Sequence, residues 1–536
     1  MKSAFAPILS ISSFITLLVV LLSMLLSIAR AAEPAAGETW GTWRGPAATG
    51  GSDTAKPVTE WSETKNVKWK VKLEGSGTAT PIIWGDKIFI ASAVNTKVKA
   101  EAPAAVEAED KNSQTRSIPR QRGTDSNIFL VQVQQQESTP NSGQERPLAD
   151  WQKRYDTDQD GKLSEKEQTA MREAFRNRRG GNNGEGRPRG GGRGFGSQKP
   201  TEVHRFILSC LDRKTGETLW TKTAIEQLPH EGHHRDHGFA SASPVTDGEH
   251  IYVSFGSRGI FCFDMDGNKK WEKDLGDMRT RAGFGEGTSP ALHGDTLVIK
   301  WDHEGDSFLV ALDKKSGEER WRKGRDEQTT WATPFVVDSG GTPVVVATGS
   351  GMVAAYDLKT GDIVWQTEGL TGNPIPSPVT DGELVYVMSG FRGSKAFGIK
   401  LGKTGKLSAE NGIAWSYDEG TPYVPSPLLY GGRLYFYQTN NAILTCLDAK
   451  TGEPHYARER VDGIRGAYAS PLGANGHVYL LGREGGCVVI KAGDELEIVA
   501  TNKLDEKFDA SPALAGDEIF LRGHEHLYCI APPSTD

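Results

Sequence analysis

Cysteine is scarce in this chain of 536 residues, which has five, and a C-x-x-C-H sequence is lacking. Covalent attachment of a c-type haem is therefore excluded. An excess of positive charge is lacking too, because 62 Lys and Arg residues stand against 69 Asp and Glu, for a formal net charge of −7. This charge balance gives no reason to expect nucleic acid or an anionic membrane surface as a partner.

The five cysteines occur in similar local sequences, such as LSCLD, IFCFD and LTCLD. We interpret them as occupying one position of a repeat, the position filled by Ala311 in LVALD and Ala355 in VAAYD; they are Cys210, Cys262, Cys446, Cys487 and Cys529. Equivalent positions of different repeats lie far apart, so we predict small, buried and unpaired thiols and no disulfide.

An apolar run from Ile8 to Ala29 follows Lys2 and ends in the small-residue pattern Ala29-Arg30-Ala31. This arrangement is typical of a secretory signal peptide, which we place at residues 1–31. The run is also about 20 residues long, enough to cross a bilayer, so an uncleaved anchor is the alternative and the one route to membrane attachment. We expect an exported protein, periplasmic or extracellular.

A small hydroxyl residue followed by Pro recurs eight times along the chain. The copies are Thr80-Pro81, Ser243-Pro244, Ser289-Pro290, Thr333-Pro334, Ser377-Pro378, Ser426-Pro427, Ser470-Pro471 and Ser511-Pro512. From the second copy onward they are 41 to 49 residues apart, and each opens a series of short alternating apolar segments. A period in the forties built from short strands indicates a β-propeller. We predict an all-β protein with eight four-stranded blades.

The last repeat stops in APPSTD without the fourth strand and its Trp. The missing strand stands at the other end of the chain, where NVKWKVKL (66–73) carries Trp69 just before the first repeat. Pairing of the two chain ends would remove an open sheet edge. Residues 40–94 are thus predicted to hold the closing strand and the start of blade 1, and residues 204–536 the remaining blades.

Residues 95–203 interrupt the first repeat between its second and third strands. Their Ala/Glu-, Ser/Gln- and Arg/Gly-rich flanks predict disorder. Within them, DTDQDGKLSEKE has oxygen ligands at the spacing of an EF-hand calcium loop, contributed by Asp156, Asp158, Asp160, Lys162 (through its carbonyl), Ser164 and Glu167. We therefore predict a small α-helical EF-hand at 148–176 that binds Ca²⁺, the one cofactor we expect.

The repeats resemble those of the PQQ-type β-propeller superfamily, which includes quinoprotein dehydrogenases and BamB-like outer-membrane assembly factors. The opening TWRGPAATG (42–50) and WSETKNVKWKVKL (61–73) are similar to exported PQQ-like proteins of planctomycete-type bacteria. Quinoprotein alcohol dehydrogenases place two adjacent cysteines beside the quinone, and this chain has no adjacent cysteines, so PQQ is not expected. The lipid-anchoring Cys of the BamB family is missing as well.

One face of the predicted propeller collects polar loops, including HEGHHRDHG (230–238). The candidate ligand- or metal-binding residues there are His233, His237, His303, Arg258, Arg392, His524 and His526. A solvated loop whose histidines serve hydrogen bonding is the alternative. We expect a monomeric envelope scaffold that binds an unknown protein or small molecule at this face. A quinone- or metal-dependent oxidoreductase is the second hypothesis.

Overall fold

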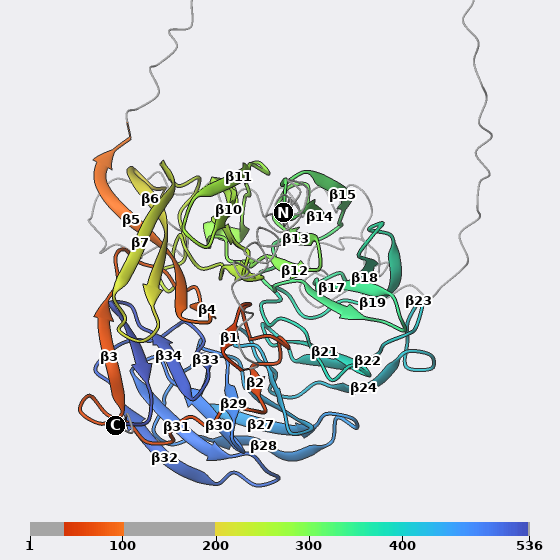
Figure 1. Ribbon diagram of the computed structural model, residues 1–536. Coiled ribbons are helices and arrows are strands. Elements are labelled where there is room, and N and C mark those ends of the chain that lie inside the picture. Colours follow the sequence, from red (N-terminus) through yellow and green to blue (C-terminus); the bar gives the residue numbers. More distant parts are fainter. Residues whose placement is uncertain (1–36, 101–198, 534–536) are drawn as a thin grey trace, which may run out of the picture. The chain divides into compact units, whose positions relative to one another are not determined.

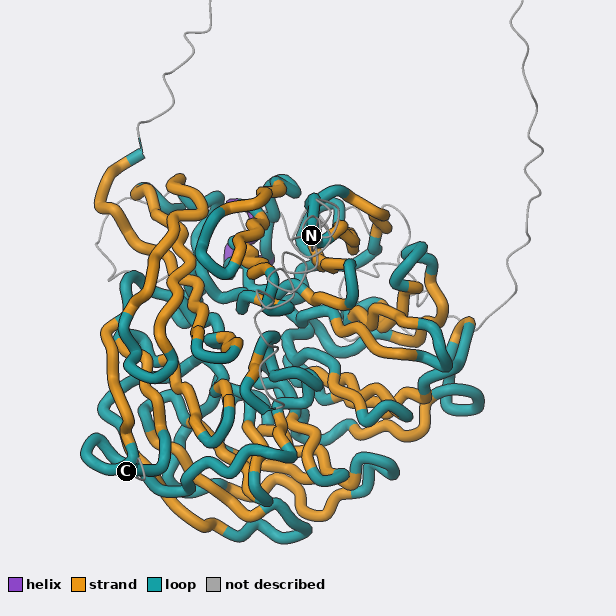
Figure 2. Tube along the Cα trace, viewed as in Figure 1, coloured by secondary structure: helices purple, strands orange, loops and turns teal. Residues whose placement is uncertain are grey.

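The computed structural model describes residues 37–100 and 199–533, and these residues form eight β-sheets (Figures 1 and 2). Each sheet is one blade of a propeller, so the predicted all-β, eight-bladed fold is confirmed. Within these residues no helix is long and apolar enough to cross a membrane. The predicted signal peptide and EF-hand lie outside the described residues and stay predictions.

The blades follow one another along the chain, and each runs from its inner strand outward. Blade 1 contains β4(Ile82–Trp84), β5(Lys87–Lys99), β6(Glu202–Asp212) and β7(Thr218–Gln227). Blade 2 contains β8(Val245–Thr246), β9(His250–Ser254), β10(Ile260–Asp264) and β11(Lys269–Lys273). Blade 3 contains β12(Ala291–His293), β13(Thr296–Trp301), β14(Phe308–Asp313) and β15(Glu319–Gly324). Blade 4 contains β16(Phe335–Asp338), β17(Pro343–Ala347), β18(Met352–Asp357) and β19(Ile363–Glu368).

The second half of the propeller repeats this order. Blade 5 contains β20(Val379–Thr380), β21(Leu384–Ser389), β22(Lys395–Lys400) and β24(Ile413–Tyr417). Blade 6 contains β25(Leu428–Tyr430), β26(Arg433–Tyr437), β27(Ile443–Asp448) and β28(Pro454–Arg460). Blade 7 contains β29(Leu472–Ala474), β30(His477–Leu481), β31(Gly486–Lys491) and β32(Ile498–Lys503). Blade 8 contains β33(Ala513–Ala515), β34(Glu518–Arg522), β35(His526–Ile530) and β3(Val67–Lys72).

The ring closes as the sequence predicts. Strand β3 pairs antiparallel with β35, and Trp69 lies opposite Cys529. The Trp69 indole N–H donates a 3.0 Å hydrogen bond to the carbonyl of Arg213 in blade 1. Blade 8 is therefore built from both ends of the chain and has no missing strand.

Tryptophans wedge neighbouring blades together at their outer edges. The indole N–H groups of Trp271, Trp321 and Trp415 each donate to a main-chain carbonyl in the turn of the next blade, at 2.8 to 2.9 Å. A Cβ atom on the turn glycine there, as at Gly317, would come within 2.8 Å of the indole. The recurring Gly and Trp of the repeat thus form one contact between blades, in addition to the positive φ that the turn requires.

The sequence predicted four strands in every blade, and three sheets contain a fifth. Short strands β1(Thr39–Trp40) and β2(Gly51–Ser52) add to the inner strands of blades 1 and 7, and β23(Gly405–Lys406) adds to the outer strand of blade 4. The first and last strands of a blade have main-chain N–H and C=O groups without a partner strand. The three short strands form hydrogen bonds with some of these groups.

The prediction that all five cysteines share one repeat position is wrong for Cys487. All five are buried, unpaired thiols. In blade 6, Cys446 lies opposite Tyr435, but in blade 7 the residue opposite the matching Tyr479 is Val489. Cys487 lies two residues earlier on the same face of its strand, because side chains of a strand alternate between faces.

The Ser/Thr-Pro motifs form a ring of hydrogen bonds at the propeller axis. The main-chain N–H of Thr80 donates to the Ser243 hydroxyl of blade 2, at 2.9 Å. Six more bonds of this kind, at 2.9 to 3.3 Å, link each motif to the next up to Ser511. The Thr80 hydroxyl donates to the Ser511 carbonyl and closes the circle. The repeat motif is therefore the inner lining of the axis.

Candidate functional site: a chamber on the propeller axis

The N-terminal segment between β1 and β2 lies at the axis. Arg44 is buried, and its guanidinium donates to the carbonyls of Pro471 and Pro427, at 2.8 and 2.9 Å. Burial without a carboxylate partner lowers the pKa of Arg44 to about 9. A Cβ on Gly50 would clash with this guanidinium, so only glycine fits at this position beside the bound Arg44. The sequence predicted that residues 40–94 hold the closing strand and the start of blade 1. It did not predict that residues 42–50 lie against the inner strands of blades 6 and 7.

A chamber of about 680 Å³ lies beside this segment. Trp43 lines it together with six of the eight motif hydroxyls, including those of Thr80 and Ser511. The remaining walls come from loops that join blades or join the second and third strands within a blade. This volume is within the range of about 300–1,000 Å³ that is typical of sites for small molecules.

One wall of the chamber is a continuous arc of cationic, amide and aromatic groups. Arg281 donates a 3.0 Å hydrogen bond to the side-chain oxygen of Asn373. Tyr423 is stacked on Phe391 with ring centroids 4.9 Å apart, and the Arg392 guanidinium lies 5.2 Å from the Phe391 ring centroid. Burial raises the pKa of the Tyr423 hydroxyl, which therefore stays protonated and can donate a hydrogen bond.

A polar strap joins the 230–238 loop to blades 7 and 8 at the rim of the chamber. Arg483 bridges Asp236 and Asp509, at 3.3 and 2.6 Å, and its guanidinium lies 3.8 Å from the Tyr468 ring centroid. His524 bonds to Asp509 at 2.9 Å, which raises the pKa of this imidazole. The two carboxylates of the chamber are thus already neutralised by neighbouring cations.

The structure separates the site residues that the sequence grouped together. Only His237 and Arg392 of the seven line the large chamber. His303 accepts a hydrogen bond from the Arg279 N–H, His526 bonds to Glu506, and Arg258 pairs with Asp277. Within residues 37–100 and 199–533, no three His, Cys, Asp or Glu side chains are grouped so that they could hold a metal ion.

His233 and His237 pack against a glycine-rich segment of the next loop. A Cβ on Gly285 would come within 2.9 Å of the His233 Cβ and of the His237 imidazole. The His237 Nδ1 shares a 2.8 Å hydrogen bond with Ser241, and burial lowers the pKa of His237 to about 4. His237 is therefore neutral at physiological pH, and its proton affinity is too low for an effective general base.

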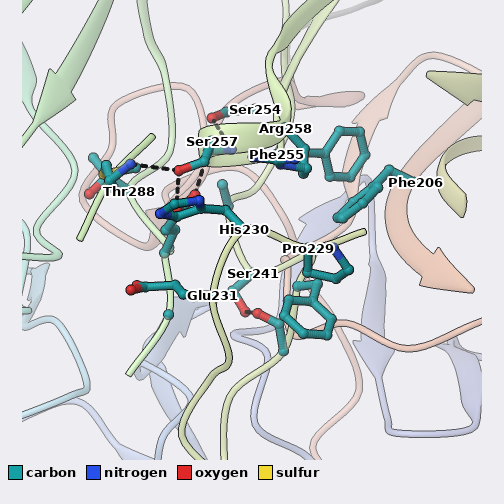
Figure 3. Close-up of a pocket in the computed structure, with 18 of the residues that line it drawn as sticks. Phe206, Pro229, His230, Glu231, Ser241, Ser254, Phe255, Ser257, Arg258 and Thr288 are labelled. Atoms are coloured by element: carbon teal, nitrogen blue, oxygen red, sulfur yellow. Dashed lines mark hydrogen bonds between the residues drawn. The ribbon is translucent and has the colours of Figure 1, made fainter. Parts of the chain in front are cut away.

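A second, much smaller cavity of about 40 Å³ is lined by residues of blades 1, 2 and 3 (Figure 3). The Glu286 carboxylate lies there and accepts hydrogen bonds from the main chain and hydroxyl of Ser257. Burial raises the pKa of Glu286 to about 7. Phe206 and Phe255 line another side, with centroids 5.2 Å apart. The space suits a water molecule or two rather than a substrate.

Sequence reasoning missed most of the chamber wall. Arg281, Trp331, Asn373 and Tyr423 each belong to a different connection between blades, and none stands in a recognisable motif. Trp331 and Tyr423 each precede a Ser/Thr-Pro motif by two or three residues, which was the one available sign that they approach the axis.

Three overlapping segments, residues 139–341, 204–455 and 305–534, match the family model of the outer membrane protein assembly factor BamB. Together they cover well over half of the chain. This chain belongs to the BamB family. BamB of Moranella endobia (strain PCIT) is 22% identical over 358 residues, which are 62% of this chain and 84% of that protein. BamB of Yersinia pestis is 21% identical over 336 residues, 59% of this chain and 77% of that protein.

A solved structure of a quinohemoprotein alcohol dehydrogenase from Comamonas testosteroni is also similar. It has a TM-score of 0.52 and 10% sequence identity, and the match covers 95% of this chain and 82% of that one. At this identity the likeness concerns the propeller fold alone. The BamB family relationship is therefore supported by sequence, whereas this structural likeness shows the propeller fold alone.

Proposed function

We propose that this protein is an exported binding propeller of the cell envelope, which holds partner proteins at the face where the axial chamber opens. Membership of the BamB family supports a scaffold role. The observation that carries the proposal is the loop face itself: exposed charged loops surround the axis. The Asp236–Arg483–Asp509 strap holds these loops, and all eight blades of the ring have at least four strands. Rigid scaffolds that present polar loops are well suited to binding.

The same proposal includes a calcium-binding EF-hand in the insert and a monomeric propeller. The insert leaves from the β5–β6 hairpin, whose strands are paired as far as Lys99 and Glu202. That hairpin tip belongs to the same set of second-to-third-strand connections as Arg392 and Arg483. Calcium binding by Asp156, Asp158, Asp160 and Glu167 follows from the loop spacing.

The proposal is tested by site-specific photo-crosslinking in cells. A crosslinking amino acid at Arg235 or Glu484, both exposed on the loop face, should yield discrete adducts to envelope proteins. Matched positions at Lys315 and Lys359 lie in the exposed turns of the opposite face and should yield none. Equal labelling at both faces, or no adduct at the loop face, would contradict the scaffold assignment.

A quinone- or metal-dependent oxidoreductase is the second candidate function, favoured by the shared propeller fold. The described residues do not reproduce a quinone site of the dehydrogenase kind, because the five cysteines lie on five different strands and none is adjacent to another. We therefore derive no redox step at the chamber. Dye-linked alcohol oxidation by the purified protein with added PQQ and Ca²⁺ would revive this candidate.

A further inference from the structure

We propose that the axial chamber is a binding site for a small organic anion with a flat apolar body, such as an aryl carboxylate or aryl phosphate. This inference goes beyond the proposed scaffold role and does not depend on it. It rests on three features of the chamber: the balance of its charges, the chemistry of one wall, and the strained backbone that places that wall.

The charges of the chamber leave an uncompensated positive potential. Arg281 and Arg392 both line the chamber, and no carboxylate of the described residues lies within ion-pair distance of either guanidinium. The two carboxylates that line it, those of Asp236 and Asp509, are already paired with Arg483. Because low-dielectric walls focus the field of unpaired charges, an anion is attracted into this space.

Buried Arg44 adds to the same potential. Its guanidinium binds the carbonyl of Pro471, the residue that follows the chamber-lining Ser470, and it has no carboxylate partner among the described residues. Guanidinium groups bind carboxylate and phosphate oxygens with paired N–H donors. Arg281 and Arg392 are therefore suited to the charged group of the ligand.

The body of the ligand would contact aromatic side chains. Between the two arginines lie Asn373, Tyr423 and Phe391, connected by a hydrogen bond, a ring stack and the Arg392 contact. Trp331 lines the same chamber, and its indole N–H donates to the carbonyl of Gly285. Flat aromatic faces favour a planar apolar body, and the Asn373 amide provides polar contacts at its edge.

The backbone of this wall is held in an unfavourable conformation. Ala282, Asn373 and Arg392 have φ values of 54°, 55° and 53°, in the left-handed region that non-glycine residues rarely adopt. Each such residue costs on the order of 1 kcal/mol and persists where the surrounding structure requires it. All three line the chamber, so the surrounding structure holds this wall in place where the proposed ligand binds.

The test is isothermal titration of the full chain with 2-naphthoate, 2-naphthyl phosphate and the uncharged isostere 2-naphthamide. Binding of either anion, at least tenfold tighter than the amide, is expected, and the ratio of the two anions identifies carboxylate or phosphate as the preferred group. The Arg281→Gln/Arg392→Gln double variant should weaken anion binding at least tenfold. The matched variant Arg460→Gln removes an exposed arginine from outer strand β28 and should change nothing.

Equal binding of naphthoate and naphthamide would overturn the proposal, as would an unchanged affinity in the double variant. Thermal unfolding of each variant without ligand separates a lost site from a lost fold. Where the double variant unfolds early, Tyr423→Phe is the second test and should weaken binding by a smaller factor with the fold retained. Binding of an acidic peptide in place of all three probes would assign the chamber to a polypeptide and also overturn the proposal.

Discussion

The main-chain N–H of Thr80 is bonded to the hydroxyl of Ser243 across 163 residues of sequence, at 2.9 Å. Both residues are buried at the axis. This bond links blade 1 to blade 2 in spite of the long insert between them. The same contact recurs around the ring, so the motif hydroxyl of every repeat except the first accepts a bond from an amide of the preceding repeat.

Replacing Ser243 with Ala should destabilise the propeller. The Thr80 amide would lose its partner in a buried position, which costs about 1–3 kcal/mol in the free energy of unfolding. Urea unfolding followed by tryptophan fluorescence measures this loss. The control variant Ser209→Ala removes a less buried hydroxyl that bonds to Thr221, and it should cost well under 1 kcal/mol. Similar losses in the two variants would contradict the axial ring as a source of stability.

The Trp69→Ala variant should open the ring at one place. Strand β3 is joined to blade 8 by pairing with β35, and Trp69 fixes it to blade 1 through its contact with Gly216. Loss of the indole should raise hydrogen exchange in β3 and β35 selectively, because no turn connects these two strands and non-covalent contacts alone hold them together.

Trp271→Ala is the matched comparison, since Trp271 makes the same contact with Gly317 of the next blade. Its strand β11 continues directly from β10 through a short turn, so local opening should be smaller. Hydrogen exchange read by mass spectrometry distinguishes the two variants. Equal exchange in the affected strands would mean that the closing strand is no weaker than an ordinary one.

The sequence was sufficient to predict the ring because the same physical requirement recurs in every blade. The repeat has a hydroxyl residue at the axis, an Asp and a Gly in the turn, and a Trp at the outer edge. Each of these residues makes a short-range contact that recurs from blade to blade. Even the closing strand could be predicted, since the last repeat lacked a segment that NVKWKVKL could supply. Cys487 was misplaced because in blade 7 Lys491 stands at the end of the third strand, where blade 6 has Asp448, so the sequence does not mark the register there.

The chamber could not be predicted in the same way. Arg281, Asn373 and Tyr423 come from three connections between blades that differ in length and sequence, and they meet only because the ring brings their ends to one axis. The histidines of the 230–238 loop are close together in the sequence, which suggested a shared binding site. In the fold they point to different partners, since a loop without regular structure does not direct neighbouring side chains to one point.

Stability should fall as the pH rises from about 4.5 to 7 because of Glu286. Burial raises the pKa of its carboxyl from 4.5 to about 7 in the folded protein. The folded state therefore binds a proton that the unfolded state has released in this interval, so the contribution to stability is complete below pH 4.5 and lost as the pH passes 7.

The Glu286→Gln variant should remove this part of the pH dependence. Between pH 4.5 and 7, the free energy of unfolding of the wild-type protein should fall by about 1–3 kcal/mol more than that of the variant. Urea unfolding at a series of pH values measures this difference. Glu484→Gln, a change at an exposed glutamate, should leave the slope as it is. Parallel curves for the wild-type protein and Glu286→Gln would show that the Glu286 carboxyl is ionised in the small cavity.

Calcium should bind once per chain, in the insert. A lone EF-hand lacks the partner hand that usually stiffens its loop, so we expect a dissociation constant of about 10⁻⁴–10⁻³ M, in the range of extracellular modules. Isothermal titration of the full chain with CaCl₂ measures both values. The double variant Asp156→Ala/Glu167→Gln removes the first ligand and the bidentate one, and it should bind no Ca²⁺ in this range.

Glu173→Gln is the matched control for charge, because it lies beyond the loop and supplies no ligand in the EF-hand pattern. It should bind Ca²⁺ as the wild-type protein does. An unchanged stoichiometry in the double variant would place the ion elsewhere and remove the EF-hand assignment. Loss of binding in both variants would mean that the ion is attracted by the net charge of the insert and not coordinated by the loop, because only coordination depends on which carboxylate is removed.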